Sequence, residues 1–367
     1  MAELPNFGTL NGEELLEKLQ QYCVSVGVSD IHTSPEKDHV RLEIRLHGLL
    51  QELSKITHEN YEQVVRRIKF LSKLKLNIVN IPQDGQYTFK SEDRQVNVRV
   101  ATLPSRFGET ITLRLLDPKN GIIPLVDLGF PQDMKEQLDA LVKLPHGLVL
   151  VTGPTGSGKT TTLYSLLSTV IGTSRNIITL EDPVEYEIRG IVQSEIDSEH
   201  GFTFASGLRS VLRHDPNIIL VGEIRDLETA QTAIDAALTG HLVLSTLHTN
   251  SAIEAIPRLL SMGVSPYTFA PSLRAILAQR LIRTLSPEAK AKGNYDPADP
   301  ASYSGRIVLP ELLTVSQQMR DMILVQERSE AIAEQARKDG YLTMKEWGNV
   351  IAEQGITSKE EIARVTS

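Results

Sequence analysis

Gly153-Pro154-Thr155-Gly156-Ser157-Gly158-Lys159-Thr160 is the stretch that decides the fold. It fits the phosphate-binding loop (P-loop) pattern G-x-x-x-x-G-K-[ST] at every fixed position. Residues 148–151 before it form an apolar run that predicts a buried parallel strand. Residues 161–171 after it lack Gly and Pro and carry apolar side chains at helical spacing. The loop therefore joins a strand to a helix, which is the context that phosphate binding requires.

Each residue type in the loop has a physical role. Glycines let backbone N–H groups point at phosphate oxygens, and the helix N-terminus adds partial positive charge. Lys159 can reach the outer phosphates, and Thr160 can ligate Mg²⁺. The alternative without a function is a glycine-rich turn that binds no ligand. We expect the nucleotide-binding set to comprise Gly153, Pro154, Thr155, Gly156, Ser157, Gly158, Lys159, Thr160 and Thr161.

Composition narrows the class of protein. The 367 residues are 41% hydrophobic and 23% charged, with a net charge of −8, as in ordinary globular proteins. The acidic balance and the 5% of aromatic residues argue against nucleic-acid binding. One cysteine, Cys23, excludes a four-cysteine zinc site. The first residues do not resemble a signal peptide, and no apolar stretch is long enough to span a membrane, so we expect a cytoplasmic protein.

Residues 1–117 predict a small α+β domain. Amphipathic helices are expected at 13–26 and 61–74, a hairpin at 40–53, and strands at 95–100 and 110–115. If the last two strands form a symmetric hairpin that turns near Arg106, Arg99 lies opposite Arg114. Like charges in that position repel each other. Either an anion lies between them or both arginines point into water, and the sequence favours neither.

Residues 118–131 contain many Pro and Gly residues, which predicts an interdomain linker. From residue 132 to 367, strands expected at 177–180, 218–221 and 242–244 alternate with helices, including 208–213 and 227–238. This alternation around a P-loop predicts a doubly wound, mainly parallel sheet with ligands at the strand C-terminal ends. A loop is expected at 287–305, and the remainder is expected to be mostly helical.

Three polar clusters follow or flank these core strands. They are Glu181-Asp182-Pro183-Val184-Glu185, then Gly222-Glu223-Ile224-Arg225-Asp226, and finally His241 with Ser245-Thr246-Leu247-His248. Each alone could be a solvated loop. Phosphoryl transfer to water needs a carboxylate that positions the water and cations that offset charge. Glu223 is the predicted base, with Glu181 or Glu185 as alternatives, and His248 is a candidate γ-phosphate sensor. Because Gly222 replaces the usual Asp, the metal contact falls to Thr160, waters or Asp182.

Taken together, the motifs resemble the secretion ATPase superfamily that drives type II secretion and type IV pilus machines. The resemblance begins near Ser29 and covers the opening motif 29–32, Ile81-Pro82-Gln83-Asp84-Gly85, the P-loop, the acidic boxes, the histidine box 239–250 and Gln279-Arg280-Leu281. It implies a RecA-like P-loop NTPase domain preceded by a small PAS-like domain. It also implies ATP and Mg²⁺ as cofactors, with His241 among the nucleotide-binding residues and Arg99 and Arg114 reaching the γ-phosphate.

The resemblance further implies a homohexamer that passes mechanical work to a platform protein in the inner membrane. Departures are the missing four-cysteine zinc insertion after Gln279-Arg280-Leu281, the missing extra N-terminal domain, and His47 where Asp is usual. We expect a motor that extends a pilus or pseudopilus, located in the cytoplasm and bound to the inner membrane through a partner. Alternatives are a retraction ATPase, a DNA-uptake motor, a small-molecule kinase, or a nucleotide-binding scaffold without turnover.

Overall fold

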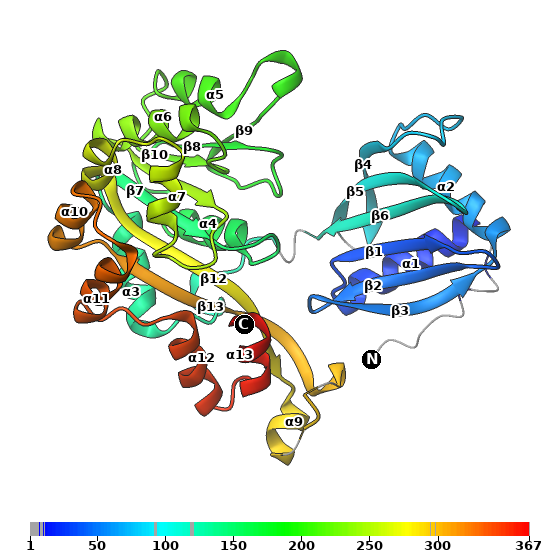
Figure 1. The fold of residues 1–367 in the computed structure, drawn as a ribbon. Helices are drawn as coiled ribbons and strands as arrows, with labels where there is room; N and C mark the ends of the chain where they lie inside the picture. Colours follow the sequence, from blue (N-terminus) through cyan, green and yellow to red (C-terminus); the bar gives the residue numbers. More distant parts are fainter. Residues whose placement is uncertain are drawn as a thin grey trace. The chain divides into compact units, whose positions relative to one another are not determined.

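A computed structural model describes residues 7, 10, 12–91, 94–117, 121–293, 295–297 and 299–366. The chain divides into two compact units, Met1–Gly121 and Ile122–Ser367. Each unit has its own sheet and its own core, and each is described separately below (Figure 1).

The N-terminal unit is built on a sheet in the order β3-β2-β1-β6-β5-β4. All neighbouring strands in this sheet pair antiparallel. Helices α1 (Gly12–Val26) and α2 (His58–Leu71) cover one face of it (Figure 1). The strands are β1 (Asp30–Pro35), β2 (Val40–Leu46), β3 (Leu49–Ile56), β4 (Gln83–Ser91), β5 (Arg94–Ser105) and β6 (Gly108–Leu116).

Strict alternation places the core of this unit on the helix-covered face. Val96, Val98 and Val100 of β5 are buried there, with Ile111 and Leu113 of β6 beside them. The expected register is confirmed, because Arg99 lies directly opposite Arg114 and the hairpin turns between Ser105 and Gly108. Strands β1 and β4 were not predicted as strands. Strand β1 overlaps the motif 29–32, and β4 overlaps the motif 81–85. Polar residues in these motifs mask the alternation of apolar and polar side chains that indicates a strand.

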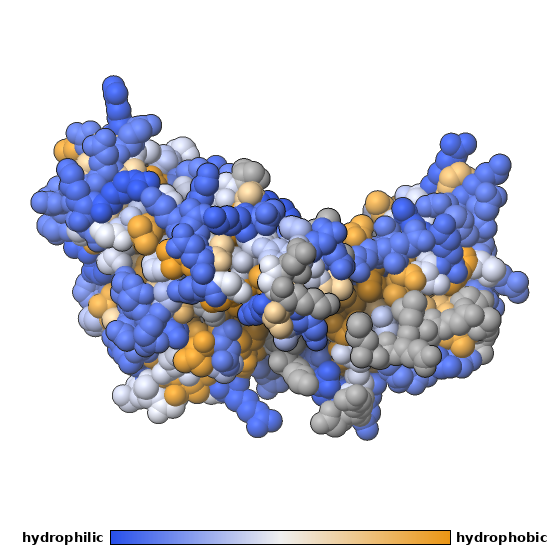
Figure 2. Space-filling model, turned by 90° about the horizontal axis from the view of Figure 1, so that it is seen from below, coloured by the Kyte–Doolittle hydropathy of each residue, from blue (hydrophilic) through white to orange (hydrophobic). Residues whose placement is uncertain are grey.

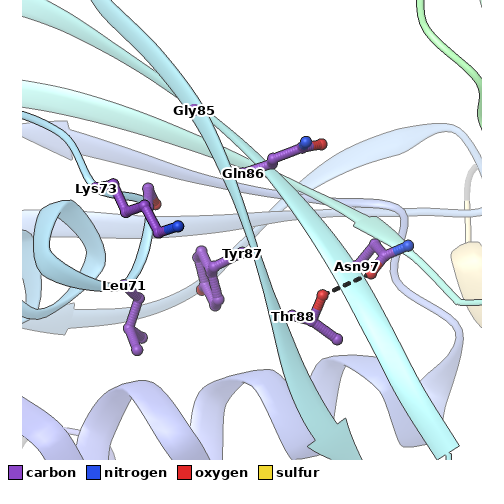
Figure 3. Close-up of a pocket in the computed structure, with 8 residues that line it drawn as sticks. Leu71, Lys73, Gly85, Gln86, Tyr87, Thr88 and Asn97 are labelled. Carbon is purple, nitrogen blue, oxygen red and sulfur yellow. Dashed lines mark hydrogen bonds between the residues drawn. The ribbon is translucent and has the colours of Figure 1, made fainter. Parts of the chain in front are cut away.

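The Pro-Gln-Asp-Gly motif fixes the loop that follows α2. The Gln83 side-chain amide donates to the carbonyls of Lys75 and Ile78, at 3.1 and 2.9 Å, and its oxygen accepts from the Lys75 N–H at 2.8 Å. A groove of about 640 Å³ lies beside the end of α2, and Figure 3 shows residues that line it. The Tyr87 ring and Leu71 line it, and Thr88 bonds to Asn97 at 2.7 Å along one side.

The C-terminal unit contains a sheet in the order β13-β12-β7-β11-β10-β8-β9. All neighbouring strands run parallel except β13, which is antiparallel to β12. The P-loop strand therefore lies inside the sheet. The strands are β7 (Gly147–Thr152), β8 (Ile177–Glu181), β9 (Val192–Glu195), β10 (Ile218–Val221), β11 (Leu242–Leu247), β12 (Leu273–Leu285) and β13 (Tyr303–Thr314).

Two apolar layers sandwich this sheet. One contains α3 and α4, and the other contains α5 to α8 and most of the C-terminal helices. The helices are α3 (Gln132–Val142), α4 (Lys159–Ser168), α5 (Phe204–Val211), α6 (Leu227–Leu238), α7 (Ala255–Ser261), α8 (Pro266–Ser272), α9 (Pro287–Lys292), α10 (Gln317–Leu324), α11 (Ser329–Lys338), α12 (Met344–Glu353) and α13 (Lys359–Thr366). The mixed α/β, RecA-like architecture that the sequence predicts is confirmed.

Four boundaries differ from expectation. Strand β11 continues through Leu247, so Ser245 and Thr246 are buried strand residues and not a loop. The region after residue 305 is mostly helical, as expected, but the unpredicted strand β13 occupies 303–314. Its Pro310 is tolerated because β13 is an edge strand, where a missing N–H need not break a ladder. Residues 287–292, expected in a loop, form α9, and β12 was not predicted.

Most of the segment predicted as a linker belongs to the C-terminal unit. Residues 118–120, with Pro118, lie outside the described residues. From Ile122 onward the chain belongs to the C-terminal unit. Leu125, Leu128 and Phe130 are buried in the same layer as α3 and α4, and the Leu128 carbonyl accepts a bond from Val308 N–H at 2.9 Å.

Hydrophilic side chains dominate the face shown in Figure 2, and hydrophobic residues appear between them as separate patches. Within the described residues, no helix combines the length and hydropathy that crossing a bilayer requires.

Candidate active site

The P-loop follows the carboxyl end of β7 and leads directly into α4. Gly153, Gly156 and Gly158 all adopt positive φ, at 149°, 79° and 86°. Side-chain-bearing residues rarely take such angles, so these glycines allow the loop to curl over the helix N-terminus. Pro154, Thr155 and Gly156 are exposed, whereas Lys159, Thr160 and Thr161 are half-buried in the first turn of α4.

Lys159 bridges the mouth of the loop. Its ammonium donates to the carbonyls of Gly153 at 2.9 Å and Pro154 at 3.1 Å. Burial lowers the pKa of Lys159, the nearby carboxylate of Glu223 opposes that shift, and the guanidinium of Arg280 adds to it. The loop lysine therefore lies within electrostatic reach of an acid from β10 and a cation from β12.

Glu223 lies just past the end of β10, as predicted from the strand pattern. Its carboxylate accepts a bond from Arg225 at 2.5 Å and lies 3.6 Å from His248 Nε2. The Thr246 hydroxyl donates to the Gly222 carbonyl at 2.7 Å, and Ile224 N–H donates to the Thr246 carbonyl at 3.0 Å. These bonds between the ends of β10 and β11 fix where the Glu223 backbone lies. The acid is only 18% exposed.

His248 joins the same cluster from the end of β11. Burial lowers the pKa of His248, the positive charge of Lys159 lowers it further, and Glu223 partly opposes both. His248 therefore favours the neutral form near neutral pH, in which one ring nitrogen donates and the other accepts. The sequence prediction that Lys159, Glu223 and His248 converge at the strand ends agrees with this geometry.

The first acidic cluster divides into two environments. Glu181, at the end of β8, is buried and accepts bonds from the Tyr164 hydroxyl, from Thr179 at 2.6 Å and from Gln193 at 3.2 Å. Burial, then the charge of Glu181, raises the pKa of Tyr164. Asp182 is more open and lies 3.9 Å from Arg225. Glu185 is half-buried in the following loop.

These contacts distinguish the predicted acids as candidates for the catalytic base. The Glu181 carboxylate has its oxygens occupied by three protein donors, so it is suited to holding α4 against β8 rather than to activating water. Asp182 and Glu223 converge on one guanidinium, that of Arg225. Glu223 therefore remains the better candidate for the base.

His241 does not fit its predicted place beside the nucleotide. It precedes β11, whose first residue Leu242 pairs with Gly147 at the start of β7. The P-loop begins after Thr152, at the other end of the same strand. Five residue steps of strand separate the two edges, which is about 17 Å at 3.3 Å per residue. The His241 ring instead lies 3.0 Å from the Ala236 carbonyl at the end of α6.

Arg99 and Arg114 lie on the face of the N-terminal sheet that the helices leave uncovered. Arg114 donates to Asp30 at 2.9 Å, and Arg45 lies 3.8 Å from the same carboxylate. Burial alone would raise the pKa of Asp30, but its bonds to Arg114 and Ser29 outweigh burial and lower it. The opening motif 29–32 thus supplies a counter-charge that the sequence argument did not include.

Three neighbours of the site were part of the sequence motifs but were given no role there. Gln279 and Arg280 come from β12, and Arg225 comes from the loop after β10. Arg280 donates to the side-chain oxygen of Asn250 at 3.2 Å and to its backbone carbonyl at 3.3 Å. For Gln279 and Arg280, the signal that could have indicated a role is the polar residues at 279, 280 and 283 within an apolar run, because such residues in a buried strand need specific partners.

A P-loop lies between an internal parallel strand and a helix, and an acid follows β10, which one strand, β11, separates from the P-loop strand β7. This arrangement defines a RecA-like P-loop NTPase. Comparison with known proteins then specifies the family. The family model for "Type II/IV secretion system protein" matches residues 10–364. The chain therefore belongs to this family of secretion ATPases.

Individual relatives are similar along nearly the whole chain. The type II secretion system protein E of Klebsiella pneumoniae is 42% identical over 96% of this chain and 75% of its own length. The type II secretion system protein HxcR of Pseudomonas aeruginosa is 42% identical over 92% and 74%. Among solved structures, the pilus retraction motor PilT with bound ADP has a TM-score of 0.68 at 27% identity and covers 95% of this chain and 96% of its own.

Proposed function

We propose that this protein is a hexameric motor ATPase that assembles a pseudopilus or pilus, acting in a type II secretion system or a related machine. The convergence of Lys159, Glu223 and His248 at the mouth of the P-loop is the observation that carries the proposal. The relatives named above at about 40% identity are type II secretion proteins. The retraction motor is more distant, at 27%, which favours assembly over retraction.

Each residue at the strand ends has a chemical role in this proposal. Backbone N–H groups of residues 155–161 and the Lys159 ammonium bind the β- and γ-phosphates. Glu223 accepts a proton from the attacking water and orients it. Arg225 holds the Glu223 carboxylate in place through its 2.5 Å bond. Neutral His248 donates to the γ-phosphate and responds to its loss.

The donor set at this edge fits Mg²⁺, a hard cation that prefers oxygen ligands. The Thr160 hydroxyl and, through water, the carboxylate of Asp182 would hold it. When bound, Mg²⁺ offsets charge on the β- and γ-phosphates. The absence of zinc stays a prediction. Cys23 is buried in α1, where burial raises the pKa of its thiol to about 12, and metal analysis of the purified protein tests the prediction.

Arg99 and Arg114 complete the proposed site from the N-terminal unit. An arginine that reaches the transferring phosphoryl group contributes roughly 10³–10⁵ in rate. The proposed domains are residues 1–117 and 132–367, joined by the predicted linker 118–131. The hinge through which the arginines approach and leave is proposed at the boundary between the two units, before Ile122. A platform protein in the inner membrane would receive the motion and hold the ATPase at the membrane.

The test is ATP-dependent phosphate release with and without Mg²⁺. The parent protein should turn over only with Mg²⁺, and Lys159→Ala should abolish turnover because the phosphates lose their main cation. Turnover that persists unchanged in this variant would reject the site.

A further inference from the structure

Gln279 lies on β12, next to the strand that carries the P-loop (Figure 1). Ala278 pairs with Thr152, the last residue of β7, so Gln279 comes one step beyond the point where the P-loop begins. Its side chain is fully buried. A fully buried glutamine behind a phosphate-binding loop needs a physical explanation, because burying an amide has a cost unless its polar atoms are bonded.

The Gln279 amide nitrogen donates to the Ser157 carbonyl at 2.7 Å. That carbonyl belongs to the same peptide unit as the Gly158 N–H. In a trans peptide the C=O and N–H bonds point in opposite directions. Holding the carbonyl toward β12 therefore directs the Gly158 N–H away from β12, to the concave side of the loop.

Gln279 also closes the space behind two loop glycines. A Cβ on Gly153 would lie 2.5 Å from the Gln279 backbone carbonyl oxygen, and a Cβ on Gly158 would lie 3.3 Å from the Gln279 side-chain nitrogen. The glycines at these positions thus serve a second purpose besides backbone freedom, which is to let the loop rest against Gln279.

Core stability alone explains this arrangement poorly. The Gln279 side-chain oxygen and the Ser157 hydroxyl are both buried, and neither has a bonding partner among the described residues. A residue selected only for packing would be apolar and would leave no such oxygen, since buried polar groups are nearly always paired. What the glutamine adds over an apolar residue is the single bond to the Ser157 carbonyl.

We propose that Gln279 is a positioning residue of the nucleotide site, which holds the Ser157–Gly158 peptide in the orientation that presents the Gly158 N–H to a phosphate. The proposal rests on the assignment of the P-loop as the ATP site. Gln279 touches no substrate and acts through the loop backbone. Its loss should weaken nucleotide binding more than it slows the step that follows.

The test compares Gln279→Met with the parent protein in the full chain. Methionine has a similar length and no donor, so the Ser157 carbonyl loses its bond while the packing is kept. We expect the Kd for Mg²⁺ and a non-hydrolysable ATP analogue to rise roughly 10- to 100-fold, the range for one hydrogen bond to a charged group. The KM for ATP should rise in parallel, while kcat at saturation falls less than about tenfold.

Gln20→Met is the matched control, because Gln20 is another buried glutamine with a bonded side chain, on α1. It should lower Tm and leave the Kd unchanged. If Gln279→Met does not fold, Gln279→Asn decides with the same readouts, because its shorter amide cannot reach the Ser157 carbonyl. An unchanged Kd in whichever variant folds overturns the proposal. Lys159→Ala distinguishes failure of the role proposed for Gln279 from failure of the ATP-site assignment. If the Lys159→Ala variant binds the analogue with the parental Kd, the assignment of the P-loop as the ATP site is wrong.

Discussion

Replacing Glu223 with glutamine is the most direct test of the chemistry at the strand ends. The substitution keeps the size and shape of the side chain, and the amide oxygen can still accept the bond from Arg225. What it removes is the negative charge and the ability to accept a proton from water. We expect turnover to fall roughly 10²–10⁴-fold, the usual contribution of a positioned general base. That loss corresponds to about 2.7–5.4 kcal/mol of transition-state stabilisation.

The same substitution should change stability little. The Arg225 side chain is 62% exposed. An ion pair with so much exposure to solvent contributes at most about 1 kcal/mol to stability. In a unit of this size, 1 kcal/mol shifts Tm by about 2–4 °C. Nucleotide affinity should stay near the parental value, because the P-loop contacts are unchanged. Loss of the Glu223 charge should also lower the pKa of His248 further, since that charge now opposes the shift.

The assays are steady-state phosphate release, Kd for a non-hydrolysable analogue, and Tm. Glu346→Gln is the matched control, because Glu346 also pairs with an arginine, Arg337, at 2.9 Å. Glu346 also accepts a bond from the Thr343 N–H at the start of α12, and the amide oxygen of glutamine can accept the same bond. The control should therefore change stability little and leave kcat unchanged. A Glu223→Gln enzyme within tenfold of parental turnover, with binding retained, would refute the assignment of the base.

Three further outcomes are expected. Arg99→Ala and Arg114→Ala should each reduce turnover severely with binding largely retained, whereas Arg106→Ala at the hairpin tip should matter less; parental turnover in the first two contradicts closure of the domains on ATP. Light scattering at micromolar protein with Mg²⁺ and a non-hydrolysable analogue should give the mass of a hexamer, and a strictly monomeric mass counts against a motor. Glu361→Gln should cost about 3–5 kcal/mol, because it leaves Arg283 buried without its charge partner. Burial alone would raise the pKa of Glu361, but its bonds to Arg364 and Arg283 outweigh burial and lower it. The contribution of Glu361 to the free energy of unfolding is therefore complete above the unfolded pKa near 4.3 and disappears as pH falls through the folded pKa. Glu360→Gln, at an exposed neighbouring position, should show neither the loss of stability nor its pH dependence.

The P-loop and its neighbours could be predicted from sequence because their structure is determined locally. Glycine spacing, an apolar strand before the loop and helical spacing after it all lie within about twenty residues. The register of β5 and β6 was predictable for the same reason, because strict alternation of valines fixes which side chains lie opposite each other. Proximity in sequence misled for His241, since one strand length separates it from His248 in space.

Arg99 and Arg114 show how a correct register can support an incomplete argument. Their repulsion suggested an external anion, but Asp30 from β1 already bonds Arg114 at 2.9 Å. Strand β1 pairs with β6 and is far from it in the chain, so no local pattern could reveal this partner. The fold therefore keeps both arginines without a nucleotide, and the kinetic comparison with Arg106 carries the test of their role.

Strand β12 was missed because its polar residues are explained only by distant partners. Gln279 is buried against a loop that precedes it by more than a hundred residues, at Ser157. Arg283 is buried because Glu361, near the C-terminus, accepts bonds from its N–H, Nε and Nη2 at 2.9, 3.0 and 2.7 Å. An interpretation based on sequence periodicity assigns such polar residues to the surface, so each of them interrupts the predicted strand. In a strand that bonds to neighbours on both sides, a polar residue that interrupts an apolar run instead indicates a contact worth locating, and in β12 one of these contacts is with the P-loop.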